Sequence, residues 1–191
     1  MRTSTITSRQ ASAQLTAYLQ LLTAGQHAGG LLEIRHSNRH ATMSRLFIPA
    51  QQTDTAARTI ASIATRADVY CGVLLRTRHA GGRDAVASAH LVWAEIDQPD
   101  ALTRLAEFQH QSTMIIRSGT PGHAYAYWHL RQPASIPELE QANRRLAHHL
   151  GADRAAVDAA RILRPCGTRN HKHHPPRRSR SPPTSRRDAT H

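Results

Sequence analysis

The sequence has few aromatic residues, only two cysteines and no long hydrophobic run. Phe, Trp and Tyr make up 4% of the 191 residues, and 39% of the residues are hydrophobic. These values allow the core of one domain and exclude two full domains. No run of about 18 apolar residues occurs, so we expect no membrane span, and no apolar segment follows Met1, so we expect no secretory signal. Cys71 and Cys166 cannot form a disulfide framework and suit a reducing cytoplasm.

The sequence also lacks a P-loop motif and is poor in acids. It has 25 Lys and Arg residues against 13 Asp and Glu, a net charge of +12, which predicts a polyanionic partner such as nucleic acid. About half of this charge lies in residues 169–191, which contain no Leu, Ile, Val, Phe, Met, Trp or Tyr. We therefore expect one domain, residues 1–168, followed by a disordered basic tail, residues 169–191.

Hydrophobic periodicity predicts an α+β fold. Helical spacing occurs in residues 9–24, 53–66, 99–109 and 135–150, the last opened by a capping box of Ser135 and Glu138. Short apolar or alternating segments predict strands at residues 31–35, 43–48, 69–75, 91–97, 114–117, 123–130 and 161–164. The turn-connected strands favour helices packed on a largely antiparallel sheet.

Two acids stand at the end of the clearest predicted strand, LVWAEID. Strand alternation places Glu95 and Asp97 on one face, with Val92, Ala94 and Ile96 on the core face. Adjacent carboxylates repel each other unless a cation lies between them, and oxygen ligands suit Mg²⁺ or Mn²⁺. An isolated pair of this kind is more often two exposed acids before a helix.

A glycine-rich turn and a basic strand form two further candidate segments. The turn begins Ser118-Gly119 and ends Gly122-His123, and its backbone N–H groups could approach an anion. Alternation then places His123, Tyr125, Tyr127 and His129 on one polar, aromatic face. The basic strand holds Arg161 and Arg164, whose guanidinium groups suit phosphate, and it follows two acids, Asp153 and Asp158. Taken singly, each segment also fits an ordinary hairpin or a basic strand.

In this order, the three segments resemble the archaeo-eukaryotic primase superfamily, in its plasmid- and phage-type replication primase branch. That family has an acid-hydrophobe-acid strand, then a Ser-Gly…His hairpin, then an acid followed by a strand of the form R-h-h-R-x-P-G-[ST]-x-[NH]-x-K. The matching segments here are 95–97, 118–123 and 153–172, and the resemblance covers about residues 30–172. It implies a primase-polymerase fold, in which an RRM-like catalytic core with a mostly antiparallel sheet and flanking helices packs against an accessory α/β half.

The resemblance also implies DNA primase activity, a template-directed nucleotidyl transfer that uses two Mg²⁺ or Mn²⁺ ions. Glu95, Asp97 and Asp153 would be the catalytic metal ligands, with Asp158 as the alternative to Asp153. The residues implied to bind nucleotide or template phosphates are Ser118, Gly119, His123, Arg161, Arg164 and Lys172. The implied partners are a single-stranded DNA template, nucleoside triphosphates and a separate replicative helicase.

Three departures from the family pattern leave a second interpretation open. Glu95 stands where Asp is commoner, Arg164-Pro165-Cys166-Gly167 replaces an Arg-Leu-Pro-Gly order, and a basic tail follows Lys172. The alternative is a truncated or inactive primase-like module that binds nucleic acid without turnover.

Overall fold

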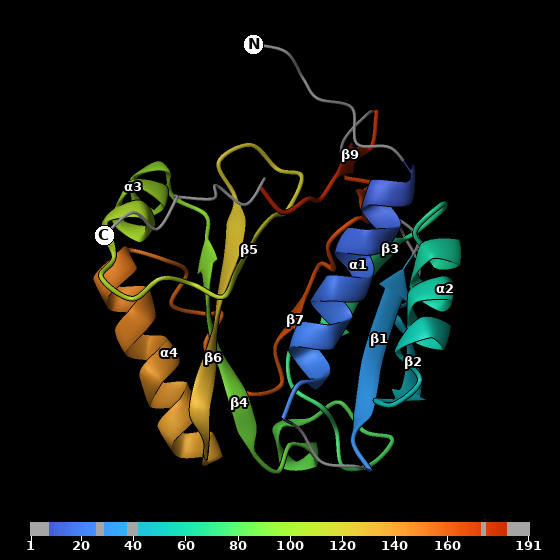
Figure 1. Cartoon of the computed structure of the whole chain (residues 1–191), viewed down its shortest axis with the longest axis horizontal. Coiled ribbons are helices and arrows are strands. Elements are labelled where there is room, and N and C mark those ends of the chain that lie inside the picture. Colours follow the sequence, from blue (N-terminus) through green and yellow to red (C-terminus); the bar gives the residue numbers. More distant parts are fainter. Residues whose placement is uncertain (1–7, 26–28, 38–41, 173–174, 183–191) are drawn as a thin grey trace, which may run out of the picture.

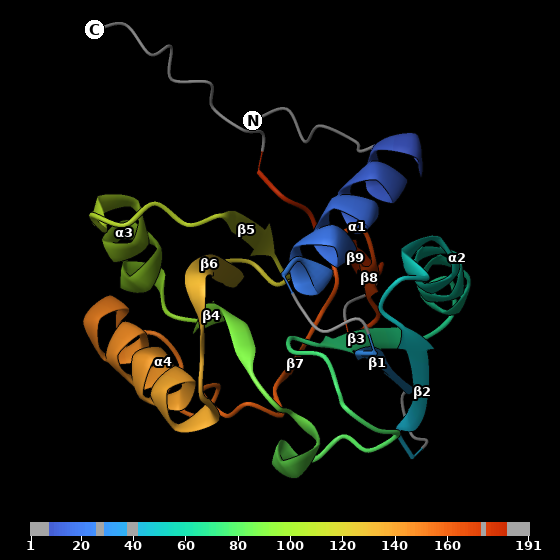
Figure 2. The same ribbon diagram turned by 60° about the horizontal axis from the view of Figure 1, so that its bottom comes forward.

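Two larger antiparallel sheets, each with its own helices, form most of the fold (Figures 1 and 2). The structure is a computed structural model that describes residues 8–25, 29–37, 42–172 and 175–182. Residues 38–41, between the predicted strands at 31–35 and 43–48, lie outside the described residues. The combination of helices with antiparallel sheets confirms the α+β class.

The first half is built on a four-stranded sheet with the order β2-β1-β3-β7. Its elements are α1 (Ser8–Thr23), β1 (Leu31–Ser37), β2 (Ser44–Pro49), α2 (Thr53–Ile63), β3 (Asp68–Gly72) and the late strand β7 (Ile162–Leu163). Helix α2 buries Ala56 and Ile60, which lie four residues apart on one face. The predicted last strand is thus only two residues long, and it pairs with β3.

A buried ion cluster occupies the middle of this sheet. The carboxylate of Glu33 on β1 is fully buried and lies 2.6 Å from Arg35, 3.0 Å from Arg45 and 2.8 Å from Arg76. Arg76 is also fully buried and donates to the carbonyl oxygens of Ala159 and Ala160. The cluster therefore ties the sheet to the segment that precedes β7.

The second half is built on a three-stranded sheet with the order β4-β6-β5. Its elements are β4 (Ala89–Ile96), α3 (Pro99–Glu107), β5 (Met114–Arg117), β6 (Ala124–Ala134) and α4 (Ile136–Leu150), preceded by the short helix η1 (Arg83–Ala85). The expected capping box of Ser135 and Glu138 opens α4. The succession βαββα with an antiparallel sheet is the RRM-like half that the resemblance implies.

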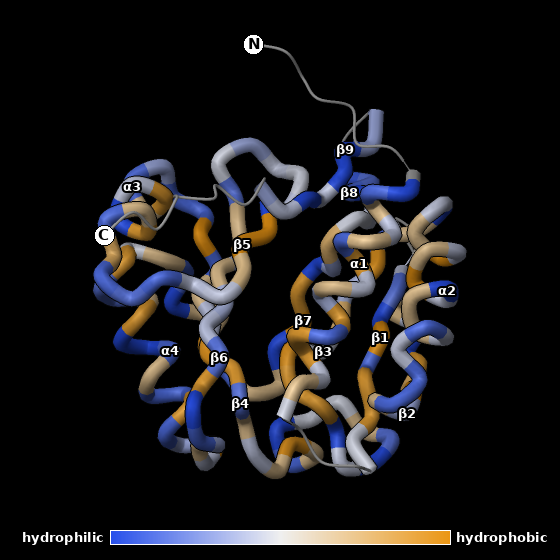
Figure 3. Tube along the Cα trace, in the orientation of Figure 1, coloured by the Kyte–Doolittle hydropathy of each residue, from blue (hydrophilic) through white to orange (hydrophobic). Residues whose placement is uncertain are grey.

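One hydrophobic core spans both halves. Helix α1 lies between the two sheets in both views (Figures 1 and 2), and Tyr18 on α1 meets Tyr127 on β6 edge to face, with ring centroids 6.0 Å apart. Hydrophobic positions concentrate on α1 and on the strands, while α4 carries hydrophilic positions on its outer side (Figure 3). The shared core fixes the orientation of the two halves.

The structure differs from the expected disordered tail over residues 169–172 and 175–182. Strand β8 (Arg169–Asn170) pairs with β9 (Arg177–Arg178), and Arg180 exchanges two backbone hydrogen bonds with Arg117 of β5. This segment is held by polar contacts, since the buried Ser179 hydroxyl bonds to the Pro165 carbonyl at 2.7 Å. Counting apolar residues therefore missed its order. Residues 173–174 and 183–191 lie outside the described residues.

No helix within the described ranges has the length and apolar character needed to cross a membrane.

Candidate functional site

The two acids that end β4 lie at the end of the RRM-like sheet. Both Glu95 and Asp97 are half-buried, while Val92, Ala94 and Ile96 are buried as the alternation predicts. Leu91 and Trp93, on the same strand face as Glu95, are buried as well. On this face of β4, therefore, only the end of the strand, at Glu95 and Asp97, is accessible to a ligand.

Asp153 lies directly beside Glu95. Gly151 ends α4 in the left-handed conformation, with φ of 65°, and the chain then runs along β4 so that the N–H of Asp153 donates to the Glu95 carbonyl at 2.9 Å. The Asp153 Oδ1 accepts a hydrogen bond from the N–H of Ala155 at 2.8 Å. The turn after α4 thus positions this third acid.

The pKa of Glu95 is raised above its ordinary value. Burial is the largest cause, and the negative charge of Asp153 adds to it, as does that of Asp97. Arg161 and Lys172 act in the opposite direction and lower the pKa. Two acids and two bases therefore act on this carboxylate.

The chemistry of this donor set fits a divalent cation. A cation would relieve the repulsion that raises the pKa of Glu95, and all the available donors are carboxylate oxygens. Within the described residues, however, no three such side chains lie close enough together to hold one ion.

Asp158, the alternative third acid, is engaged elsewhere. Its Oδ2 lies 2.7 Å from Nη2 of Arg161, and its side chain is 46% exposed. The same Nη2 also contacts the carbonyl of Ala155. The Nε of Arg161 is buried and has no hydrogen-bond partner among the described residues.

The glycine-rich turn lies at the same end of the sheet as the acids. Ile96 pairs with Ala124, and Ala124 pairs with Arg117, so Asp97, His123 and Ser118 continue three adjacent strands. The N–H of Ser118 donates to the His123 carbonyl at 3.1 Å, and the N–H of Thr120 donates to the Ser118 hydroxyl at 3.3 Å. The turn is therefore closed by its own hydrogen bonds.

The prediction of a polar, aromatic face after this turn is wrong for Tyr125 and Tyr127. Tyr125 is 7% exposed and Tyr127 is fully buried, and both belong to the core between the halves. The physical reason is that the first half, through α1, covers this face of the sheet. His123 is half-buried and His129 is exposed.

Arg164 is buried and fully engaged by protein groups at its two terminal nitrogens. Its Nη1 lies 2.7 Å from Asp68 and bonds to the Arg169 carbonyl at 2.8 Å, and its Nη2 bonds to the Tyr70 hydroxyl at 3.2 Å. The guanidinium also stacks over the Tyr70 ring. Arg164 thus joins β3 to the C-terminal segment.

The C-terminal segment brings a second base to the site and fixes the glycine-rich turn. Lys172 is exposed and acts electrostatically on Glu95. Asn170 is 3% exposed, donates to the Thr120 hydroxyl at 3.2 Å and accepts from the N–H of Lys172 at 3.2 Å. One buried amide therefore links the turn to the lysine.

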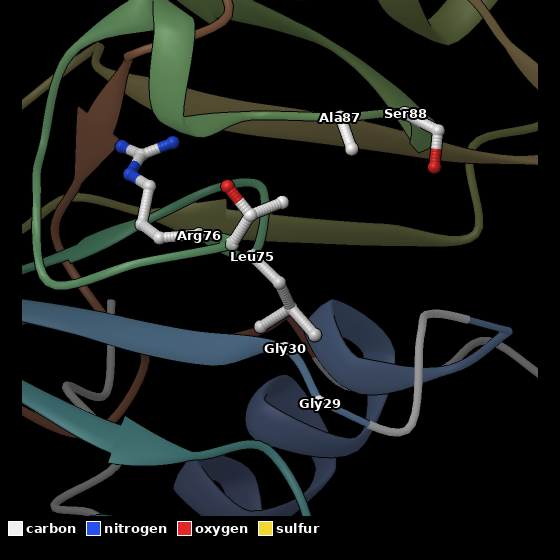
Figure 4. A pocket seen from close by; sticks show the side chains of 7 residues that line it. Gly29, Gly30, Leu75, Arg76, Ala87 and Ser88 are labelled. Atoms are coloured by element: carbon white, nitrogen blue, oxygen red, sulfur yellow. The ribbon is translucent and has the colours of Figure 1, made fainter.

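A cavity of about 280 Å³ lies at the opposite end of β4 (Figure 4). Its lining consists of Gly29, Gly30, Leu75, Arg76, Thr77, Ala87 and Ser88. These residues precede β4, whereas Glu95 and Asp97 end it. The cavity is therefore separate from the candidate site.

Asn143 is a positioning residue that sequence reasoning missed. It is fully buried on α4, accepts the N–H of Trp93 at 3.0 Å and donates to the Val157 carbonyl at 3.3 Å. It thereby links the outer edge of β4 to the segment that carries the third acid. A polar residue on the apolar stripe of a helix, between Leu139 and Ala147, was the available signal.

Solved structures of other proteins share the fold of this chain. The AEP domain of the primase-polymerase of cyanophage S-2L has a TM-score of 0.68 at 15% identity, over 87% of this chain and 88% of that one. Primase RepB' has a TM-score of 0.65 at 18% identity, over 90% of this chain and 56% of that one. The catalytic domain of primase RepB' in complex with initiator DNA has a TM-score of 0.63 at 19% identity, over 90% and 84%.

The chain has the primase-polymerase fold. The fold implied by the three sequence segments is therefore confirmed. No family model matches the sequence, and no curated protein matches it. At these low identities the structural likeness establishes the primase-polymerase fold, and the chemistry rests on the site itself.

Proposed function

We propose that this protein is a DNA primase-polymerase domain that joins nucleotides on a single-stranded DNA template. The observation that carries the proposal is the backbone hydrogen bond that places Asp153 beside the half-buried Glu95, together with the effect of Asp97, Arg161 and Lys172 on the pKa of Glu95. The fold supports the same assignment. Acids that bind cations beside bases that bind phosphate are the groups that nucleotidyl transfer requires.

Glu95 and Asp97 would hold the Mg²⁺ or Mn²⁺, with the second carboxylate oxygen of Asp153 as the third donor. When bound, a divalent ion supplies the positive charge that stabilises the reacting phosphate. Asp153 suits this role better than Asp158, because it lies beside Glu95 while Asp158 is paired with Arg161.

The nucleotide would bind between the acids and the bases. Arg161, whose Nε has no partner among the described residues, and the exposed Lys172 would supply the positive charge that attracts the phosphates. Ser118 and His123 would contact the triphosphate from the turn, whose glycines let backbone approach an anion. Arg164 would act by positioning, because its terminal nitrogens are already engaged.

The test is primer synthesis on single-stranded DNA with Mn²⁺ and nucleoside triphosphates. We expect the Glu95→Gln/Asp97→Asn double variant to lose about 100-fold or more of the activity. The matched control is Asp54→Asn/Glu107→Gln, which neutralises two exposed helix acids outside the site and should leave the activity within about twofold. Wild-type activity in the double variant would overturn the metal assignment.

A second candidate function is nucleic-acid binding without turnover. It is favoured by the finding that, in the part of the chain that the structure describes, no three acids stand together as a metal site. Wild-type protein that binds single-stranded DNA but incorporates no nucleotide with Mg²⁺ or Mn²⁺ would establish it. The separate replicative helicase stays a prediction from the sequence.

A further inference from the structure

A group of arginines surrounds the C-terminal end of α4, on the outer side of the RRM-like half. The group, called here the α4 basic surface, consists of Arg104, Arg144, Arg145 and Arg154. All four side chains are exposed, and none forms an ion pair within the described residues. His148 and His149, also exposed, lie on the same turn of the helix.

Three chain segments bring these residues together. Arg104 is in the last turn of α3, yet a Cβ placed on Gly151 at the end of α4 would lie 2.6 Å from its Nη1. Arg154 follows α4 and contacts Nδ1 of His148 at 3.1 Å. Helix α4 buries Leu139, Asn143 and Ala147 on its inner face and exposes Arg144 and Arg145, in keeping with its many hydrophilic positions (Figure 3).

The negative C-terminal ends of α3 and α4 do not neutralise the charge of the four arginines. The C-termini of α3 and α4 each contribute about −0.5 of an elementary charge, and Glu107 at the end of α3 adds one negative charge. Glu140, whose pKa Arg144 helps to lower, is already paired with Arg83 at 2.8 Å. The four arginines therefore leave a net positive surface, since none of them is ion-paired within the described residues.

The α4 basic surface meets the candidate site along the chain at Arg154. Arg154 is the next residue after Asp153, which is hydrogen-bonded to Glu95. An extended polyanion bound at the acids and bases of the site would leave it past Arg154 and along α4. Guanidinium groups bind phosphate oxygens well, and their desolvation cost is low compared with that of ammonium groups.

We propose that the α4 basic surface binds the sugar-phosphate backbone of a nucleic-acid strand beyond the candidate site. The choice of nucleic acid over another polyanion rests on the proposed function. The contact is electrostatic and independent of base sequence, so it should weaken steeply with salt. It needs neither metal nor nucleotide, which separates it experimentally from catalysis.

The test is equilibrium binding of a fluorescently labelled single-stranded DNA to the full chain, in EDTA and without nucleotides. We expect Arg145→Gln/Arg154→Gln to raise the Kd about five- to tenfold at 0.1 M salt and to reduce the slope of log K against log salt by about 1.4. The matched control Arg58→Gln/Arg66→Gln removes the same charge from exposed positions in the other half and should change the Kd less than twofold. Arg145→Lys/Arg154→Lys should largely retain binding.

Equal losses in the α4 variant and the control would overturn the proposal, because net charge alone would then explain binding. An unchanged Kd in the α4 variant would overturn it as well. A defect in binding vesicles of anionic lipid, with DNA binding intact, would assign the surface to a membrane and overturn it. If the α4 variant and the control differ in DNA binding as predicted, but the wild-type protein synthesises no primer, the α4 basic surface is upheld and the proposed enzyme activity is rejected.

Discussion

The N–H of Asp153 donates a 2.9 Å hydrogen bond to the carbonyl oxygen of Glu95. The bond fastens the segment after α4 to the edge of β4 that faces away from β6. It brings an acid that follows a helix next to an acid that ends a strand, although 58 residues separate them. The position of the third carboxylate is therefore a property of the backbone, which substitutions of the side chain should leave intact.

The first prediction separates the two candidates for the third acid. Asp153→Asn should lower primer synthesis with Mn²⁺ by about 100-fold, because the variant loses a negative charge beside Glu95. The amide oxygen can still accept from the N–H of Ala155, so the turn should persist. Asp158→Asn should lower activity less than about tenfold, since Asp158 is a half-exposed partner of Arg161.

Thermal unfolding provides the control for these two variants, and both should melt within a few degrees of the wild-type protein. A larger loss of activity in Asp158→Asn than in Asp153→Asn would reverse the assignment of the third ligand.

The second prediction concerns pH and the metal-free protein. Because the pKa of Glu95 is raised in the fold, the folded state binds more protons than the unfolded state, and this group costs stability as pH rises from its ordinary value through the raised one. Glu95→Gln has no charge to bury. It should therefore gain stability relative to wild type at pH 8 and lose this advantage near pH 4, as measured by urea unfolding in EDTA.

Glu138 offers a control of opposite sign. Its pKa is lowered by hydrogen bonds from the Ser135 hydroxyl and N–H, so its stabilising effect is present above the ordinary pKa and disappears as pH falls through the lowered value. Glu138→Gln should therefore lose stability relative to wild type at pH 8. The same pH trend in both variants would contradict the assignment.

The third prediction concerns the buried ion pair of Asp68 and Arg164. The two side chains are 10% and 3% exposed and lie 2.7 Å apart. Asp68→Ala should lower the free energy of unfolding by about 3 kcal/mol, because it leaves a buried guanidinium without its counter-charge. Asp84→Ala removes a partner of Arg78 in an ion pair that is more than half exposed and should cost less than about 1 kcal/mol. Equal losses in urea unfolding would refute the difference.

The elements with clear periodicity could be predicted from the sequence, whereas the roles of the site residues stay predictions. Strand alternation placed Val92, Ala94 and Ile96 in the core, and helical spacing with a capping box located α4. The distribution of strands between two sheets could not be predicted, because a two-residue strand such as β7 carries no periodic signal. The proximity of Asp153 to Glu95 also needed the fold, since it depends on a backbone hydrogen bond.

Polar burial accounts for the remaining differences. The sequence predicts that Arg164 binds phosphate. In the structure, its guanidinium group is instead paired with Asp68 and hydrogen-bonded to Tyr70 and the Arg169 carbonyl. The segment around Ser179 lacks large apolar residues but is ordered by side-chain to backbone hydrogen bonds. Such partners come from distant parts of the chain, and residue type alone does not reveal them.

The last prediction tests whether the C-terminal segment fixes the glycine-rich turn. Gly119 and Gly122 both have positive φ, at 89° and 77°, but a Cβ on Gly119 would lie 3.0 Å from the Arg177 carbonyl, whereas a Cβ on Gly122 would contact nothing within 4 Å. Both alanine variants should lose about 1 kcal/mol from backbone strain, and Gly119→Ala about 1–2 kcal/mol more from overpacking against β9. Gly119→Ala should also raise the KM for nucleotide more than Gly122→Ala does, measured by steady-state primer synthesis. Equal stability and equal KM in the two variants would show that the segment does not hold the turn.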